Sequence, residues 1–245
     1  GRAACEDPAV QSAAGRHIVE ALTAMGNASI ATHSRGFFKT HPGGYGEGDE
    51  FLGIRVPPIR ALVKETKPTV QVATELLGSR WHEVRFFAAA ALVGLYPKEP
   101  ETIFKTYVEH KARINSWDLV DVSAPQIVGR HLVERDRSLL YDLVASDSLW
   151  DRRIAMVATL AFIRKDDFDD AVALATRLLD DDEDLIHKAS GWMLREVGKR
   201  DEAILRTFLD THAHRMPRTC LRYAIEKLPD RKTYLGKRKE HADAA

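Results

Sequence analysis

The chain has 245 residues, 44% of them hydrophobic, which is enough apolar material to bury a sizeable core. Its 36 basic and 36 acidic residues give a formal net charge of zero, so composition alone gives no signal for a polyanionic partner. Two cysteines, Cys5 and Cys220, are too few for a disulfide framework or a cysteine-rich metal site. The apolar stretches fall short of the roughly 20 residues that span a bilayer, and no signal-peptide pattern opens the chain. We therefore expect a soluble, cytoplasmic protein.

Both ends of the chain are polar or rich in small residues. Such ends are seldom ordered unless they dock onto the fold. We expect a disordered tail over residues 1–8, one domain over residues 9–236 and a polar tail over residues 237–245.

A glycine-rich segment, HPGGYGEGDEFLGIRVPP, occupies residues 41–58. Its glycines match neither the Walker nor the dinucleotide fingerprint, because no Lys-Ser/Thr pair follows and no strand precedes them. We interpret the segment as a structural loop that leads into a helix beginning near Pro58. A phosphate cradle is the alternative.

From about residue 68 to residue 228, apolar residues recur three and four apart, with almost no alternation. This pattern predicts successive amphipathic helices and little or no sheet. Gly78 and Gly198 stand where C-terminal caps are expected. Helix starts are expected at Pro100, Asp136, Asp147, Asp166 and Pro217.

Five similar segments begin at residues 81, 115, 150, 184 and 217, at intervals of 34, 35, 34 and 33 residues. A period near 34 with two helices per unit indicates helix pairs stacked into a solenoid, because one pair cannot bury its own apolar face. The second helices would then line one concave surface. The alternative is an ordinary helical bundle with helices of equal length, and either architecture is all-α.

Basic residues recur ahead of the small-residue apolar runs in four of these segments, and a neutral chain can still carry one basic face. We expect the basic side chains to contact phosphates, although each of them could be an ordinary solvated charge. These candidates are Arg85, Arg153, Lys188 and Arg222, together with Arg195.

Trp117 and Asp121 lie four residues apart, so on a helix they share one face. Trp192 lies two repeats later. Aromatic faces can contact a deoxyribose or a cationic base, and a carboxylate can face the sugar carbon where positive charge develops. The plainer interpretation is that both tryptophans fill the core and that Asp121 pairs with a neighbouring arginine.

Neither a Ser-His-Asp nor a Cys-His arrangement is suggested, and the ten histidines show no spacing that specifies a metal site. We expect no metal and no other cofactor. We also expect Asp118 to be exposed or to cap its helix, because it is turned about 100° from Trp117. Arg152 should likewise point away from the face of Arg153.

Several strings of the chain closely resemble the AlkD family of bacterial DNA alkylation-repair glycosylases, over about residues 37–228. The strings are GDEFLGIRVPPIR, HEVRFFA, NSWDLVD, LWDRRIAMVATLAFI, HKASGWMLREVGKRD and MPRTCLRYAIEKLP. The resemblance implies an all-α, right-handed superhelical solenoid of HEAT-like helix-pair repeats with a concave DNA-binding groove.

The resemblance also implies excision of positively charged bases such as 3-methyladenine and 7-methylguanine, at the bacterial nucleoid. We expect a monomer, which is the default for a solenoid that meets DNA. The resemblance makes Asp121 the catalytic carboxylate, places Trp117 and Trp192 against the sugar of the lesion and brings Arg153 to the DNA backbone. Two other functions stay open: a non-catalytic module that binds branched or distorted DNA, and a protein-binding scaffold.

Overall fold

Side-chain caps start many of the helices in the computed structural model, which describes residues 7–242, with side chains to residue 236. The side-chain oxygens of Ser12, Asn27 and Thr69 each accept a hydrogen bond from a backbone N–H in the first turn of the helix that follows. Such caps satisfy N–H groups that have no partner within the helix. The fold is all-α. The described residues contain no strand, only an isolated bridge between Glu50 and Trp81.

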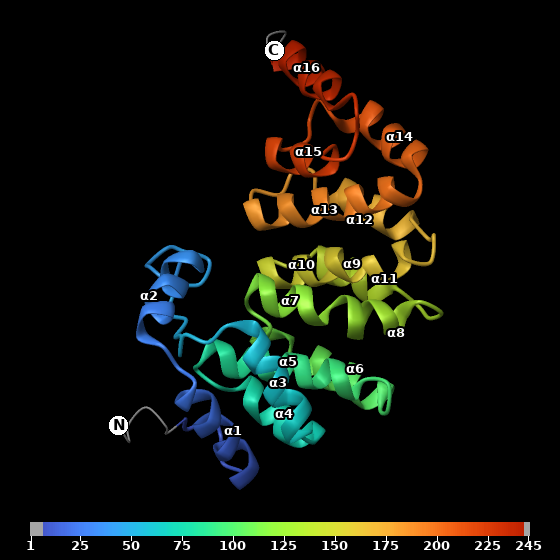
Figure 1. Cartoon of the computed structure of the whole chain (residues 1–245). Helices are drawn as coiled ribbons and strands as arrows, with labels where there is room; N and C mark the ends of the chain where they lie inside the picture. The colour runs from blue at the N-terminus through green and yellow to red at the C-terminus, as the bar shows by residue number, and fades with distance from the viewer. Residues whose placement is uncertain (1–6, 243–245) are drawn as a thin grey trace. The chain divides into compact units, whose positions relative to one another are not determined.

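The helices fall into two compact units, one ending at Ser123 and the other beginning at Ala124. Unit 1 contains α1 (Ala13–Ala24), α2 (Ala28–Phe37), α3 (Val56–Thr66), α4 (Val70–Leu77), α5 (His82–Leu95), α6 (Pro100–Glu109), the short turn η2 (Lys111–Arg113) and α7 (Trp117–Ser123). Figure 1 shows α4 beside α5, and α7 also packs against α5.

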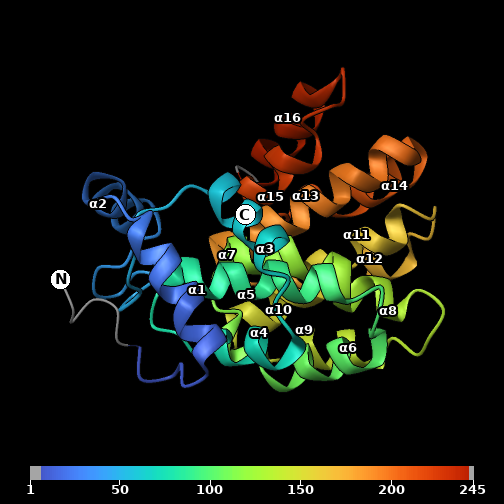
Figure 2. The same ribbon diagram turned by 60° about the horizontal axis from the view of Figure 1, so that its bottom comes forward.

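Unit 2 contains η3 (Pro125–Gly129), α8 (Arg130–Leu132), α9 (Ser138–Val144), α10 (Leu149–Ala158), α11 (Leu160–Ile163), α12 (Asp169–Arg177), α13 (Asp184–Arg200), α14 (Glu202–His212), α15 (Arg218–Ala224) and α16 (Arg231–Ala242). Within it α10 packs against α9 and α13. In turn, α13 packs against α12, α14 and α15 (Figure 1 and Figure 2).

The helical repeat predicted from the sequence is confirmed. All five predicted segments contain a helix that begins within two residues of the expected position, namely α5, α7, α10, α13 and α15. Among the residues that the structure describes, no helix combines the length and the apolar character that a membrane span requires.

Two glycines expected to end helices behave differently. Gly78 caps α4, as predicted. Gly198 lies inside α13, so its assignment as a cap was wrong. A Cβ at position 198 would lie 2.3 Å from Leu205 Cδ2, so the missing side chain lets α14 approach α13.

The predicted ends of the chain fall mostly outside the described residues. Asp7, placed in the expected tail of residues 1–8, is instead buried and accepts a hydrogen bond from the Ser79 hydroxyl at 2.5 Å. At the other end, the backbone of α16 continues the helix to Ala242, into the expected tail of residues 237–245.

Gly191 allows a close contact between α13 and α15 in unit 2. A Cβ at this position would lie 2.4 Å from the Cys220 carbonyl oxygen of α15. We predict that Gly191→Ala lowers the free energy of unfolding by about 1–3 kcal/mol, as overpacking does in other cores. Gly94→Ala in α5 is the control, because its methyl group would meet nothing within 4 Å. That variant should be neutral or more stable in urea titrations monitored by circular dichroism, and equal loss in both variants would contradict the packing argument.

Candidate functional site

The first turn of α5 carries three buried ionisable side chains, His82, Glu83 and Arg85. The Glu83 carboxylate accepts hydrogen bonds from three consecutive backbone N–H groups, those of Leu52, Gly53 and Ile54, at 2.9, 2.7 and 3.1 Å. A carboxylate with this many donors is well compensated for its burial. Glu83 therefore anchors the segment that leads from the glycine-rich loop into α3.

The glycine-rich loop itself uses its amides internally. The Gly43 N–H donates to Glu47 Oε2 at 2.9 Å, and the Gly44 N–H donates to the His41 carbonyl at 2.9 Å. The Asp49 N–H donates to the Gly46 carbonyl at 3.0 Å. These bonds support the structural interpretation of the loop over the phosphate cradle.

His82 bridges two carboxylates from different parts of unit 1. Its Nδ1 lies 2.8 Å from Asp49 Oδ2, and its Nε2 lies 2.8 Å from Asp118 Oδ2. A neutral imidazole donates from one nitrogen only, so two carboxylate partners require the imidazolium. Burial lowers the pKa of His82, but the Asp118 charge and the hydrogen bonds to both carboxylates outweigh burial and raise the pKa to about 9.

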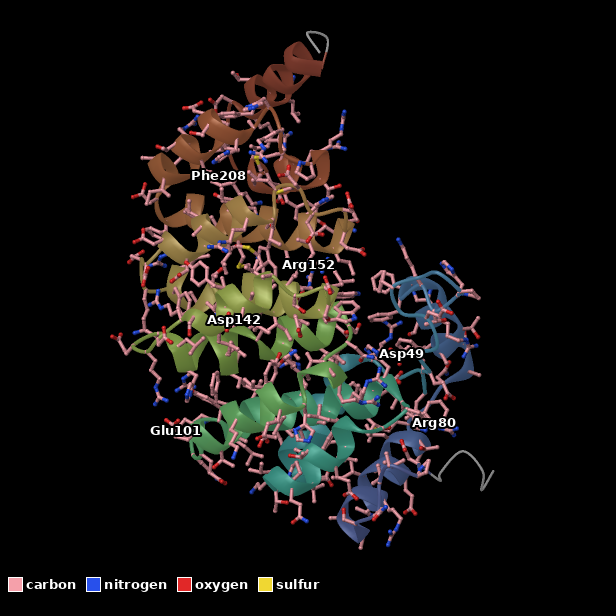
Figure 3. The ribbon with its side chains drawn as sticks, turned by 180° about the vertical axis from the view of Figure 1, so that it is seen from behind. Asp49, Arg80, Glu101, Asp142, Arg152 and Phe208 are labelled. Atoms are coloured by element: carbon pink, nitrogen blue, oxygen red, sulfur yellow. The ribbon has the colours of Figure 1, made fainter. Side chains whose placement is uncertain are left out.

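Arg85 is 3% exposed, and its guanidinium is used inside the protein. It pairs with Asp49 Oδ1 at 2.6 Å and donates to the carbonyls of Ser79 and Arg80 at 3.0 and 3.1 Å. Asp49 is labelled in Figure 3. The expectation that Arg85 contacts phosphates therefore gains no support, because the side chain faces the interior of unit 1.

Trp117 opens α7 and belongs to an aromatic cluster. Its indole stacks on Phe38, with ring centroids 5.5 Å apart and planes 10° apart. It also makes a T-shaped contact with Phe37, with ring centroids 6.0 Å apart. Phe38 also lies 4.7 Å from the His82 ring. Phe37 is 58% exposed, whereas Trp117 is half-buried, so the cluster has one face inside unit 1 and one face in solvent.

Trp117 and Asp121 are four residues apart within α7, and both side chains are half-buried. They are therefore neighbours on one helical face, as the spacing predicted. Asp118 was expected to be exposed or to cap its helix. It is not exposed, because its side chain is 14% exposed and is bonded to His82, but its other carboxylate oxygen accepts from the Leu119 N–H in the first turn of α7. The direction away from Trp117 leads into the packed interface with α5, which is why Asp118 is not solvated.

The remaining candidates belong to unit 2. Arg153, on α10, is 4% exposed and donates to the Leu185 carbonyl of α13 at 2.5 Å. Lys188, on α13, is half-buried and pairs with Asp184 at 2.9 Å. Arg153 therefore ties neighbouring repeats together, and Lys188 lies nearer to solvent.

Three further candidates lie on α13 and α15, which pack against each other. Trp192 and Arg195 are half-buried on α13, and Arg222 is exposed on α15. Arg195 is ion-paired with Glu226 and lies 6.0 Å from the centre of the Tyr223 ring. Of the five predicted phosphate contacts, Arg222 is thus the most open to solvent.

The structure also corrects the register of the repeat. Arg152 donates to the carbonyls of Ser146 and Asp147 at 3.0 and 2.9 Å, which are the residues six and five positions before it, as Ser79 and Arg80 are for Arg85. Arg152, labelled in Figure 3, is therefore the repeat equivalent of Arg85, and Arg153 is not. Arg152 also bonds Asp181 at 2.7 Å.

Sequence reasoning did not find the bridge formed by Asp49, His82 and Asp118. The available signal was three ionisable residues within four positions of an otherwise apolar helix. Asp49 and Asp118 lie 33 and 36 positions from His82, close to one repeat on either side. No group of three His, Cys, Asp or Glu side chains among the described residues is placed to hold a metal ion.

A family model and a solved structure are similar to this chain. A family model described as "DNA alkylation repair enzyme" matches residues 18–228. A solved structure described as a predicted DNA alkylation repair enzyme from Enterococcus faecalis is similar with a TM-score of 0.71 and 18% sequence identity, over 84% of this chain and 98% of that one. No curated protein gives a significant sequence match.

The raised pKa of His82 predicts a pH-dependent stability. The imidazolium stabilises the folded chain fully below pH 6.5, and this contribution is lost as the pH rises towards 9. We expect His82 to contribute up to about 3 kcal/mol to this loss, since a tenfold change in proton affinity corresponds to about 1.4 kcal/mol. Urea titrations from pH 6 to pH 10 should show a smaller decline in His82→Gln than in the parent. His17→Gln, at an exposed site on α1, should decline like the parent.

Proposed function

The chain belongs to the DNA alkylation repair enzyme family, and from this we propose that it is a DNA glycosylase. Its substrates would be positively charged alkylated purines in duplex DNA, such as 3-methyladenine and 7-methylguanine. The family assigns the chain to DNA alkylation repair and implies DNA as its partner, and the choice of reaction depends on the chemistry of α7.

The observation that carries this proposal is the pairing of Trp117 and Asp121 on one face of α7. An indole can contact a deoxyribose or a cationic base, and a carboxylate beside it can stabilise positive charge. Trp117 is supported from behind by the stacked Phe38 ring. The indole is therefore held in place before any substrate arrives, which lowers the cost of binding in a productive orientation.

A cationic purine needs no general acid. When the bond between C1′ and the ring nitrogen breaks, its electron pair neutralises the positive charge of the base, and the sugar takes on oxocarbenium character. A carboxylate about 4 Å from that charge at an effective dielectric near 20 stabilises it by about 4 kcal/mol, which corresponds to about a thousandfold in rate. Water then adds to C1′ and loses a proton to solvent, so one carboxylate is sufficient for the reaction.

The candidate residues in unit 2 would bind the DNA. Trp192 offers a second half-buried indole, and Lys188, Arg195 and Arg222 reach the surface of α13 and α15. Arg153 would contact a phosphate only by exchanging its bond to the Leu185 carbonyl for one to DNA. Arg85 would not contact DNA. It stabilises the fold of unit 1, because its partners lie inside the protein.

Asp121→Asn tests the catalytic carboxylate. It keeps the shape of the side chain and removes the charge, so we expect release of 7-methylguanine from methylated duplex DNA to fall about a thousandfold. DNA affinity should change little, because the charge acts mainly on the transition state. Single-turnover release and fluorescence anisotropy measure the two quantities.

Asp142→Asn, at an exposed position on α9, is the matched control and should release the base at the parental rate. Release by Asp121→Asn at the parental rate would exclude the catalytic role of this carboxylate. Binding of distorted DNA without release by the parent would favour the non-catalytic module. Failure to bind DNA even at low salt would favour the scaffold.

The salt dependence of DNA binding tests Arg222. Each phosphate contact that is lost reduces the slope of log affinity against log salt concentration by about 0.9. We expect Arg222→Gln to show this reduction, and Lys105→Gln, at a 77% exposed site on α6, to keep the parental slope. An unchanged slope in Arg222→Gln would remove this residue from the proposed DNA contacts.

A further inference from the structure

His82 is connected to α7 by two independent routes. The first is electrostatic, through the 2.8 Å bond from Nε2 to Asp118, which directly follows Trp117. The second Asp118 oxygen accepts from the Leu119 N–H at 3.0 Å, inside the same helical turn. The His82 imidazolium therefore holds the opening turn of α7 through the Asp118 carboxylate.

The second route runs through stacked rings. The centroid of the His82 ring lies 4.5 Å from that of Phe51 and 4.7 Å from that of Phe38. The Phe38 ring in turn stacks on Trp117. A displacement of the imidazole therefore displaces the ring that supports the indole. Both routes end at Trp117: one through the backbone of α7 and the other through the face of its ring.

From this geometry we infer that His82 is a positioning residue: it fixes the opening turn of α7 and the Trp117 indole in the orientation needed for base release. The effect on base release rests on the proposed glycosylase function. The effect on the orientation of Trp117 does not, because it follows from contacts within unit 1.

The charges around His82 make the imidazolium necessary. Asp118 faces it from α7, Asp49 faces it from the loop before α3, and Arg85 lies on its own helix and pairs with Asp49. Arg113, from η2, is close enough for the Arg85 charge to lower its pKa and for the Asp49 charge to raise it, although burial has the largest effect and lowers it. Asp49 keeps Arg85 as a partner when His82 is neutral, whereas Asp118 loses its cation. A half-buried carboxylate that has lost its counter-cation draws towards water, and a shift of Asp118 would move the opening turn of α7 with it.

The kinetic test compares His82→Gln with the parent under single-turnover conditions. Glutamine keeps one hydrogen-bond donor but has no charge, so α7 should shift slightly rather than unfold. We expect the maximal rate of base release to fall by about tenfold to hundredfold, as small misplacements of reacting groups do. The DNA concentration at half-saturation should change by less than about threefold, because binding depends mainly on phosphate contacts. His17→Gln should match the parent in both quantities.

The structural test measures the environment of the Trp117 indole directly and does not require base release. In protein labelled with 5-fluorotryptophan, the Trp117 fluorine resonance is assigned by its loss in Trp117→Phe. We expect this resonance to move between pH 6 and pH 10 with a midpoint near the His82 pKa of about 9. The movement should be absent in His82→Gln and unchanged in His17→Gln.

Asp118→Asn provides a second variant if His82→Gln does not fold. It removes the carboxylate that links His82 to α7. This variant should show the same loss of rate as His82→Gln, and it should lower the midpoint of the fluorine titration, because His82 keeps only Asp49 as a carboxylate partner. A Trp117 resonance that does not titrate, together with parental rates in both variants, would overturn the positioning role. If the parent released no base, the glycosylase proposal would fail alone, and the fluorine titration would decide the positioning role.

Discussion

The buried imidazolium of His82 is the interaction on which unit 1 depends. It joins α5 to the loop before α3 through Asp49 and to α7 through Asp118. Glu83, the next residue, accepts hydrogen bonds from the backbone N–H groups of residues 52–54. A packed interior tolerates such charges only when each has partners. The opening turn of α5 therefore sets the positions of a loop and two helices at once.

Arginine has a comparable structural use along the chain, because it closes the carbonyl ends of helices. Arg113 donates to the last carbonyls around α4, and Arg152 does so after α9. Arg137 donates to the carbonyls of Leu132 and Val133 at the end of α8, and also pairs with Asp167 and Asp170. These guanidinium groups each satisfy acceptors that a helix leaves open. The number of basic residues in a repeat protein of this kind thus overstates how many can bind phosphate.

The reaction expected at α7 needs few charged side chains, which is compatible with the structural use of most of the arginines. With a cationic leaving group and water as the nucleophile, the protein needs to supply neither a nucleophilic side chain nor a general acid, so the reaction requires one carboxylate and rigid surroundings. Rigidity comes from the aromatic cluster of Phe37, Phe38, Phe51 and Trp117, which continues into the His82 ring. Preorganised electrostatic groups contribute more to catalysis than groups that must reorient. The proposed site and the core of unit 1 are therefore parts of one packed structure.

The sequence by itself determined the helices, their period and the shared face of Trp117 and Asp121, because these depend on spacings of three and four residues along one helix. Only the tertiary structure decided what faces each side chain across the repeats. It placed Arg85 inside rather than on a DNA-binding face, joined Asp118 to His82, and showed that Gly198 serves close packing rather than helix termination. It also moved the repeat equivalence of Arg85 from Arg153 to Arg152. These partners lie about 30 or more positions apart, or depend on which side of a helix meets its neighbour, and a one-residue change of register turns a side chain by about 100°.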